Sequence, residues 1–215
     1  MQDTLKQLRT GVTEIEIFNF IKKSFIKYGA PILSFSPMVA FGKNTANIHH
    51  DEPSKSRLKK GDIIMFDIGC TMNHYCSDMS RTYFWGKKDD KTNAKQKKIY
   101  LAVLRAQELA MNKIKNGERR GGVIDRVARA FLAKKYPNNF KHGLGHGVGT
   151  VIHEWPNFKP RSEDIIPTGC VMTIEPGIYL KGFGGVRIED MILITKNGYK
   201  LLTNLPKDLK SAVLK

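Results

Sequence analysis

The feature of this sequence that most constrains its fold is a nine-residue pattern that occurs twice, at residues 61–69 and 169–177. In each copy a glycine precedes an apolar run, an acidic residue stands six positions after that glycine, and a second glycine follows two positions later. The two acids are Asp67 and Glu175. Self-similarity of this kind indicates a fold built from two similar halves.

A second acid follows in each half, and the four acids together predict a cation site. Asp78 stands 11 residues after Asp67, and Glu189 stands 14 residues after Glu175. Each acid taken alone is compatible with an ordinary residue at the end of a strand. If the two halves face each other, four carboxylates converge, and an uncompensated buried charge is very costly. Like charges repel unless a metal ion or a proton separates them, so the pattern favours bound metal.

The rest of the sequence predicts helices and strands around this repeat. The apolar run 63–66 predicts a buried strand, and residues 77–85 alternate in polarity as a second, antiparallel strand does. A capping box at residues 13–16 predicts the start of an amphipathic helix that ends at Gly29. We further expect, in chain order, a short strand at 38–41, a surface loop at 51–60, a polar connection at 87–93, a long helix with an apolar face from Tyr100 to Ile114, and a helix at 123–135 ended by Pro137.

The length and composition fit one globular domain. A chain of 215 residues with 41% hydrophobic residues is long enough to bury one substantial core. No stretch reaches the roughly 18 apolar residues of a membrane span, and the N-terminus lacks the charged-then-apolar order of a secretory signal. We therefore expect a cytoplasmic protein without a membrane partner. The three cysteines, an odd number without CxxC spacing, predict reduced thiols rather than disulfides or a zinc knuckle.

The formal net charge of +16 raises the question of nucleic-acid binding. The 26 lysines outnumber the 10 arginines and are spread along the whole chain, in short pairs such as Lys59-Lys60. No helix-turn-helix and no aromatic-rich motif for single strands accompanies them. A charged, solvated surface is the better interpretation, so nucleic acid is not an expected partner.

A histidine in a glycine-rich segment completes the candidate metal ligands. His146 lies within residues 142–149, where four glycines let the backbone pass close to a site and aim the imidazole inward. Carboxylate oxygens with one imidazole suit Mn²⁺, Co²⁺, Fe²⁺ or Zn²⁺, and bridging carboxylates hold two such ions about 3.5 Å apart. Four of the six histidines lie at 49–50 and 142–146, and His153 follows closely, a clustering that is unusual for packing alone.

Four sequence blocks carry a resemblance to a known family. Residues 69–82, Gly-Cys-Thr-Met-Asn-His-Tyr-Cys-Ser-Asp-Met-Ser-Arg-Thr, resemble the first metal hairpin of the Xaa-Pro aminopeptidases and Xaa-Pro dipeptidases. Residues 142–154, 173–179 and 184–190 resemble the remaining three blocks in the same order. The resemblance implies the pita-bread fold, an α/β (α+β) domain with two pseudo-symmetric halves around a metal-bearing antiparallel sheet.

The same resemblance implies a role for each ligand. Asp67 and Asp78 bind one metal ion, His146 and Glu175 bind the other, and Asp78 and Glu189 bridge both. A water or hydroxide between the ions is the nucleophile, because two cations lower the pKa of that water toward neutrality. Glu175 is the general base and then the acid that protonates the leaving amine. Manganese is the first expectation for both ions, with cobalt, zinc and iron as alternatives.

Outside the ligand set, the resemblance assigns further residues to the substrate. His49, His142 and His153 match the family histidines that contact substrate and stabilise the tetrahedral intermediate. His50 is the alternative to His49, because the loop that follows is one residue longer than usual. Arg187 matches an arginine that lies near the carboxylates and orients them.

The function implied is that of an exopeptidase with two metal ions, which removes the N-terminal residue from peptides, above all Xaa-Pro peptides. A homodimer is a further expected assembly. Methionine aminopeptidases share the five ligands and are the closest alternative, but His142, residues 80–82 and residues 184–190 favour the Xaa-Pro branch. Creatine amidinohydrolases lose the ligands, so the intact set argues against them. A pita-bread protein that binds peptide or RNA without catalysis fits the basic charge, but it has no need for the ligands.

We expect residues 1–215 to form a single pita-bread catalytic domain, with pseudo-repeats at about 11–115 and 118–205. Xaa-Pro peptidases usually carry a separate N-terminal domain that supports oligomerisation and helps to shape the substrate pocket. This chain begins inside what corresponds to the first helix of the catalytic domain. The N-terminal, creatinase-like domain is therefore expected to be absent.

Overall fold

The first half of the chain forms a four-stranded sheet around β3 (Ile63–Ile68). This strand is apolar on both faces, as a buried central strand requires, and it pairs antiparallel with β2 (Met38–Phe41) and β6 (Met79–Trp85). The C-terminal β14 (Val213–Leu214) adds to the outer edge of β6 in parallel orientation. The strands on either side of β3 are antiparallel, as expected, and the parallel pairing of β14 lies at the edge that receives the end of the described chain.

The second half forms a five-stranded sheet with the same central connectivity. Its strand β9 (Val171–Ile174) pairs antiparallel with β7 (Gly145–Gly147) and β12 (Asp190–Thr195). The edges are extended by β13 (Gly198–Leu201) beside β12 and by β8 (Glu154–Phe158) beside β7. The order β12-β9-β7 repeats the order β6-β3-β2, which confirms two pseudo-symmetric halves.

The glycines that open the repeated pattern have the same role in both halves. Gly61 and Gly169 adopt left-handed φ values of 84° and 96°, which side-chain-bearing residues rarely adopt. The N–H of Gly61 donates to the Trp85 carbonyl at 2.6 Å, and the N–H of Gly169 donates to the Ile194 carbonyl at 2.9 Å. Each glycine thus closes the end of an antiparallel strand pair.

A small hairpin separates the two acids of each half. In the first half it consists of β4 (Cys70–Met72) and β5 (Tyr75–Cys76), with β1 (Ile32–Leu33) beside β4. In the second half it consists of β10 (Gly177–Leu180) and β11 (Gly184–Arg187). Because both hairpins return the chain to the sheet, the second acid of each half comes back beside the first.

The capping box begins α2 (Glu14–Lys27), as predicted. The Thr13 side chain accepts a hydrogen bond from the N–H of Glu16, and the Glu16 carboxylate accepts one from the N–H of Thr13 at 2.8 Å. A short helix, α1 (Gln2–Leu5), precedes α2, and a 3-10 helix, η1 (Gly42–Ala46), follows β2. The apolar face of α2 packs on the first-half sheet, against side chains of β2 and β3.

The two remaining long helices cover the second-half sheet. The computed structural model describes residues 1–86 and 90–214, with the backbone alone at 90–93. Helix α3 (Asp90–Lys115) already includes the last four residues of the connection predicted at 87–93, because a polar sequence is compatible with a helix as well as with a loop. The first three residues of that connection lie outside the described residues. Helix α4 (Gly121–Ala133) begins and ends two residues before the predicted bounds.

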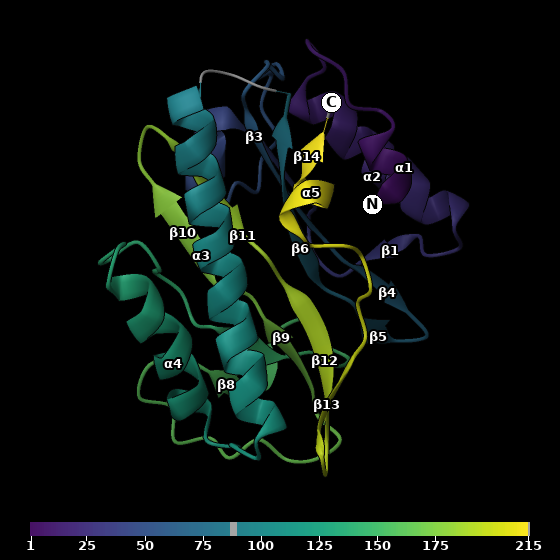
Figure 1. The fold of residues 1–215 in the computed structure, drawn as a ribbon. Helices are drawn as coiled ribbons and strands as arrows, with labels where there is room; N and C mark the ends of the chain where they lie inside the picture. The colour runs from purple at the N-terminus through teal and green to yellow at the C-terminus, as the bar shows by residue number, and fades with distance from the viewer. Residues whose placement is uncertain (87–89, 215) are drawn as a thin grey trace.

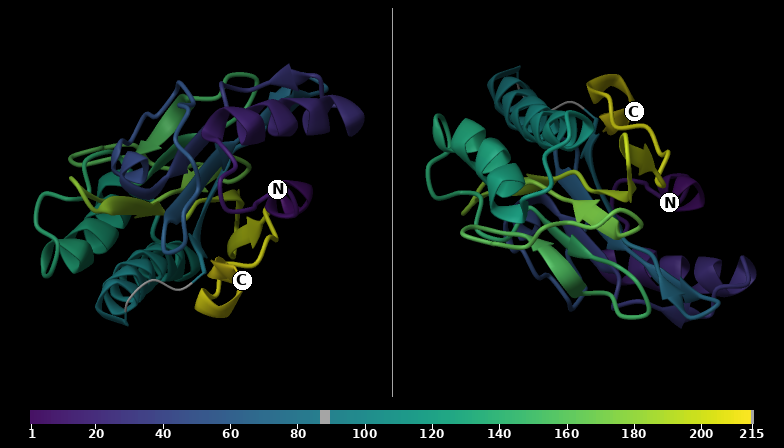
Figure 2. Two further views of the ribbon diagram at one scale, coloured as in Figure 1. Left: turned by 90° about the horizontal axis from the view of Figure 1, so that it is seen from above. Right: turned by 90° about the horizontal axis from the view of Figure 1, so that it is seen from below.

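Figures 1 and 2 show how the layers are arranged. Helices α3 and α4 lie side by side on one side of the strands, and α2 lies on the other. The larger core lies between α3, α4 and the second-half sheet, and it also takes in α5 (Leu209–Ala212). Among the described residues, no helix combines the length and the apolar character needed to cross a membrane.

The two sheets meet at the starts of β6 and β12. The N–H of Glu189 donates to the Ser80 carbonyl at 3.1 Å. Two residues along β6, the Thr82 hydroxyl donates to the Arg187 carbonyl at 2.8 Å. These contacts join the halves at the positions where each carries its second acid, so the fold itself assembles the candidate site.

Candidate metal centre

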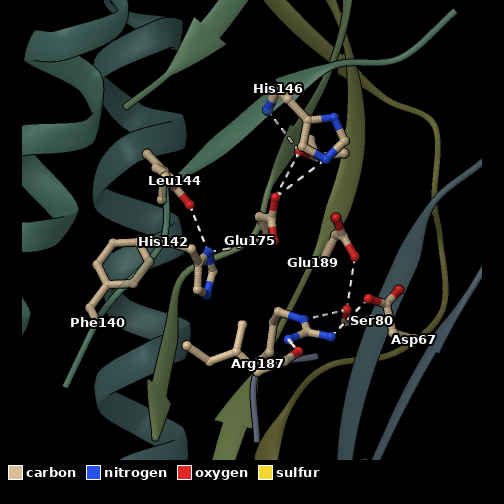
Figure 3. A network of polar contacts seen from close by, with 12 residues as sticks. Asp67, Ser80, Phe140, His142, Leu144, His146, Glu175, Arg187 and Glu189 are labelled. Carbon is tan, nitrogen blue, oxygen red and sulfur yellow. Dashed lines mark hydrogen bonds and ion pairs between the residues drawn. The ribbon is translucent and has the colours of Figure 1, made fainter. Parts of the chain in front are cut away.

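The four acids of the repeat and His146 come together where the two sheets meet, and Figure 3 shows four of the five. Asp67 is the penultimate residue of β3, and Asp78 directly precedes β6. In the second half Glu175 directly follows β9, and Glu189 directly precedes β12. His146 is the middle residue of β7. All five predicted metal ligands therefore line one cavity.

The glycines beside His146 let β7 approach its neighbours closely. A Cβ atom on Gly145 would lie 2.0 Å from the Thr173 carbonyl oxygen, and one on Gly147 would lie 2.7 Å from the Glu154 carbonyl oxygen. No side chain fits at such separations. The close approach brings the imidazole of His146 to the acids at the end of β9.

The distances within the site suit a shared cation. Ligand atoms of Asp78, His146 and Glu189 all lie within 4.8 Å of one another. The Nε2 atom of His146 lies 3.6 Å from Asp78 Oδ2 and 3.4 Å from Glu175 Oε1. Its Nδ1 atom lies 3.0 Å from the Gly147 carbonyl, so Nδ1 carries the proton and donates it there. The unprotonated Nε2 therefore faces the carboxylates, as in a metal-ligating histidine.

The pKa values of the acids and of His146 favour a bound cation at this site. Burial, followed by the charges of Glu189 and Asp67, raises the pKa of Asp78 well above its ordinary value. Burial and the charge of Glu189 do the same to the pKa of Glu175. Burial, with Asp67 adding to it, raises the pKa of Glu189 to about 8. Burial also lowers the pKa of His146 to about 4, so the imidazole is neutral. Acids under mutual repulsion beside a neutral imidazole fit a divalent cation.

Two carboxylate oxygens without hydrogen-bond donors also support a metal site. Within the described residues, Oδ1 of Asp67 and Oδ1 of Asp78 are buried without a hydrogen-bond donor. Buried carboxylate oxygens normally find donors or metal ions. The donor set of four carboxylates and one imidazole is also the one that borderline divalent ions accept. The residues present thus fit the predicted metal site.

A ring of hydrogen bonds behind the acids orients them. Arg187 donates from Nη2 to Asp67 Oδ2 at 2.8 Å, and from Nε to the Ser80 hydroxyl oxygen at 2.7 Å. The Ser80 hydroxyl donates onward to Glu189 Oε2 at 2.8 Å. A third Arg187 donor, Nη1, reaches the Tyr179 hydroxyl oxygen at 2.9 Å. One buried guanidinium therefore connects acids of both halves (Figure 3).

His142 lies next to this ring but is held differently from His146. Its Nδ1 atom lies 2.8 Å from the Gly143 carbonyl, and its Nε2 atom accepts from the Tyr179 hydroxyl at 2.8 Å. Burial, followed by the charge of Arg187, lowers the pKa of His142 to about 3. Both nitrogens are engaged with protein groups, so His142 is not available as a metal ligand in this arrangement.

Of the other histidines considered, two line the cavity and one does not. His49 and His153 line the cavity of about 520 Å³ that contains the four acids and the imidazole of His146, and the centroid of the His153 ring lies 4.2 Å from that of the His146 ring. His50, the alternative to His49, instead places Nε2 2.9 Å from a carboxylate oxygen of Glu14. His49 is thus the one of the adjacent pair that faces the site.

Several residues that contact the site were not predicted from the sequence to do so. Ser80, Thr173 and Tyr179 stand inside the quoted sequence blocks, yet only the structure shows which acid or histidine each contacts. Gln107 of α3 was predicted as part of an apolar face. Its amide donates to the carbonyls at the ends of β9 and β11 and to Asp190, contacts that no local pattern encodes.

Comparisons with known proteins agree with this geometry. The sequence matches the model of metallopeptidase family M24 over residues 1–196. The Bacillus subtilis (strain 168) protein named "Putative dipeptidase YkvY" is 42% identical over 204 residues, which make up 94% of this chain and 54% of that protein. An X-Pro aminopeptidase from Thermotoga maritima MSB8 is 35% identical with a TM-score of 0.89, and an Xaa-Pro dipeptidase from Bacillus anthracis is 37% identical with a TM-score of 0.89.

Both structural matches cover 99% of this chain but 58% of the matched chain. The fold is therefore the pita-bread fold of these peptidases, and the chain corresponds to their catalytic domain. The chain belongs to metallopeptidase family M24. This family is metal-dependent, and Asp78, His146 and Glu189 form a buried candidate metal site in this member.

Proposed function

We propose that this protein is an exopeptidase with two metal ions that removes the N-terminal residue from peptides, with Xaa-Pro peptides as its substrates. The observation that carries the proposal is the convergence of four carboxylates and one neutral imidazole on one open cavity. Without cations, three of these carboxylates have raised pKa values because they are buried beside one another. Such an arrangement is far more useful for binding metal than for stabilising the fold.

The proposed ligand set divides between two ions. Asp67 and Asp78 would hold one ion, His146 and Glu175 would hold the other, and Asp78 and Glu189 would be shared by both. When bound, two divalent ions supply an activated water and polarise the scissile carbonyl. Manganese is our first choice for both sites, with cobalt, zinc and iron as the alternatives to be tested.

The protein's own groups then handle protons and orientation. The Oε1 atom of Glu175 lies 3.4 Å from the Thr173 hydroxyl and 3.4 Å from His146 Nε2, and its Oε2 atom lies 3.7 Å from His142 Nδ1, so both oxygens lie beside groups that can orient them. We assign Glu175 as the base that accepts a proton from the attacking water and returns it to the leaving amine. His49, His142 and His153 contact the substrate, and Arg187 keeps the carboxylates oriented.

The substrate class rests on the relatives. Solved structures at 35–37% identity are described as an X-Pro aminopeptidase and an Xaa-Pro dipeptidase. The chain spans little more than half the length of each relative, so the full activity of those proteins is carried over here as a proposal. The sequence blocks that distinguish this branch from methionine aminopeptidases support the same choice.

The test is a panel of short peptides, varied at the first two positions, given to protein loaded with Mn²⁺, Co²⁺ or Zn²⁺. We expect two ions per chain and hydrolysis of Xaa-Pro peptides. Glu175→Gln should lower kcat by about 100-fold or more while the fold persists. Cleavage of Met-Xaa peptides alone would move the protein to the methionine aminopeptidase branch. If the protein cleaves no peptide and binds RNA tightly at moderate salt, the proposal that it is a peptidase is wrong.

A further inference from the structure

One of the buried carboxylates outside the metal centre belongs to Glu14, the first residue of α2. Glu14 is fully buried, and its two oxygens accept five hydrogen bonds. Oε1 accepts from the N–H of Phe41 at 2.7 Å and from the Asn44 amide at 2.9 Å. Oε2 accepts from His50 Nε2 at 2.9 Å, and from the N–H and hydroxyl of Ser54 at 2.9 and 2.6 Å. This one side chain therefore gathers donors from residues 41 to 54.

The carboxylate suits this task better than a neutral group. A carboxylate only accepts hydrogen bonds, so it can meet five donors without offering one of its own. Burial alone would raise the pKa of Glu14, but the hydrogen bonds from His50 and the other donors outweigh it and hold the pKa below its ordinary value. Glu14 is also the first residue of α2, and the positive end of the helix dipole favours a negative charge there.

The segment held by Glu14 carries residues of the cavity wall. It leaves β2 at Phe41 and passes Ile48 and His49, both of which line the cavity. The Ile48 carbonyl also accepts from Arg187 at 3.3 Å. Beyond Ser54, the Leu58 N–H donates to the Val12 carbonyl at 2.9 Å. Both ends of the segment are thus pinned to the start of α2, while its middle reaches the metal centre.

We propose that Glu14 is a positioning residue for peptide hydrolysis, whose carboxylate fixes residues 41–54 so that His49 faces the cavity while His50 is held away. Glu14 does not touch the cavity and acts through the segment. This inference rests on the proposed peptidase function, because its catalytic consequence is read from hydrolysis. Glu14 acts on His49 through the backbone of residues 41–54, because its hydrogen bonds hold residues on either side of His49.

A double-mutant cycle of Glu14→Gln and His49→Ala tests the catalytic consequence. Glu14→Gln should lower kcat/KM about 10- to 100-fold at unchanged metal stoichiometry. The amide group of glutamine would direct its two N–H donors at the donors that the carboxylate accepts from, and those hydrogen bonds would be lost. In the His49→Ala background, Glu14→Gln should lower kcat/KM only slightly further, because the imidazole that Glu14 positions is already absent. Fully additive losses would overturn the proposal. Glu16→Gln is the matched control, because Glu16 lies on the same turn and glutamine preserves the capping box.

Hydrogen exchange provides a readout that is independent of activity. In Glu14→Gln, exchange should rise across residues 41–54 and stay unchanged in β3; unchanged exchange in 41–54 would overturn the proposal. If wild-type protein cleaves no peptide, the proposed function fails, and the exchange result still decides whether Glu14 orders the segment. If Glu14→Gln does not fold, Ser54→Ala removes one donor to the same carboxylate and should produce a smaller change in the same direction.

Discussion

Two histidines that line the cavity differ in the groups that their Nε2 atoms contact. His146 directs Nε2 at the carboxylates of Asp78 and Glu175, at 3.6 and 3.4 Å. His142 directs Nε2 at the Tyr179 hydroxyl, at 2.8 Å. Both imidazoles are neutral, because burial lowers the pKa of each. The same residue type therefore serves as a candidate metal ligand in one place and as a neutral hydrogen-bonded group in the other.

Substitution by alanine should therefore affect metal binding at His146 and the catalytic rate at His142. His146→Ala should reduce metal affinity by about tenfold or more, measured by metal analysis after dialysis, because an ion loses a direct ligand. His142→Ala should leave the stoichiometry at two ions and lower kcat, because it removes the proposed substrate contact. Normal metal occupancy in His146→Ala would contradict its assignment, and a normal rate in His142→Ala would leave it a structural residue.

At the scale of secondary structure, the site depends on how closely β7 approaches β9. A Cβ atom on Gly145 would lie 2.0 Å from the Thr173 carbonyl oxygen. The neighbouring N–H of His146 donates to the Thr173 hydroxyl oxygen at 3.1 Å, so the two strands move together. Any separation of β7 from β9 would carry His146 away from Glu175.

Gly145→Ala should therefore weaken metal binding although it changes no ligand. We expect lower metal occupancy and a lower Tm, measured by metal analysis and thermal unfolding. Gly182→Ala is the matched control, because Gly182 has a φ of 78° with open space around its Cβ position. That variant should lose about 1 kcal/mol of stability through backbone strain and keep its metal. Equal loss of metal in both variants would mean that general destabilisation, and not strand separation, is responsible.

At the scale of the whole molecule, Asp190 ties the two halves to the end of the chain. Its Oδ1 atom accepts from Arg81 of β6 at 2.6 Å and from the Thr203 hydroxyl at 2.6 Å. Its Oδ2 atom accepts from Lys207 and, at 3.1 Å, from Gln107 of α3. Burial alone would raise the pKa of Asp190, but the charges of Arg81 and Lys207 hold it below its ordinary value.

Removal of this charge should be costly. Asp190→Asn leaves Arg81 buried without its partner, so the free energy of unfolding should fall by about 3–5 kcal/mol, measured by denaturant unfolding. The exposed Asp208 caps the short helix α5, and Asp208→Asn should cost no more than about 1 kcal/mol. A small effect of Asp190→Asn would show that the halves are held together mainly by their apolar core.

The acids predict a pH dependence for the metal-free protein. The pKa of Glu189 is raised to about 8, so the folded protein keeps a proton that the unfolded chain has already lost. The resulting stability is present at low pH and is lost as pH rises toward 8. The pKa values of His142 and His146 are lowered to about 3 and about 4, and their contribution is lost only as pH falls below 6.5.

Between pH 6.5 and 8 the acids therefore decide the sign, and the Tm of metal-free protein should fall. Added Mn²⁺ should reverse this trend, because the ion binds the deprotonated ligands and gains affinity as pH rises. Thermal unfolding with and without metal measures both. A Tm of the metal-free protein that rises across this window would contradict the raised pKa values.

The two-half architecture could be predicted from the sequence alone, because the repeated pattern of glycine, apolar run and acid lies within nine consecutive residues in each half. It also determined the capping box of α2 and the five candidate ligands, whose spacing places each acid at a strand end. The start of α3 at Asp90 was not predictable in this way, since a polar sequence is compatible with a helix as well as with a loop.

Only the tertiary structure decided which side chains surround those ligands. His49 and His50 are adjacent, and the choice between them depends on Glu14, a residue 36 positions away in the chain. Ser80 reaches Glu189 from the other half, 109 positions away. Such contacts depend on how the sheets and α2 pack, and no short-range pattern encodes packing between distant segments. Local spacing therefore determined what the site is made of, and long-range packing determined how its residues are oriented.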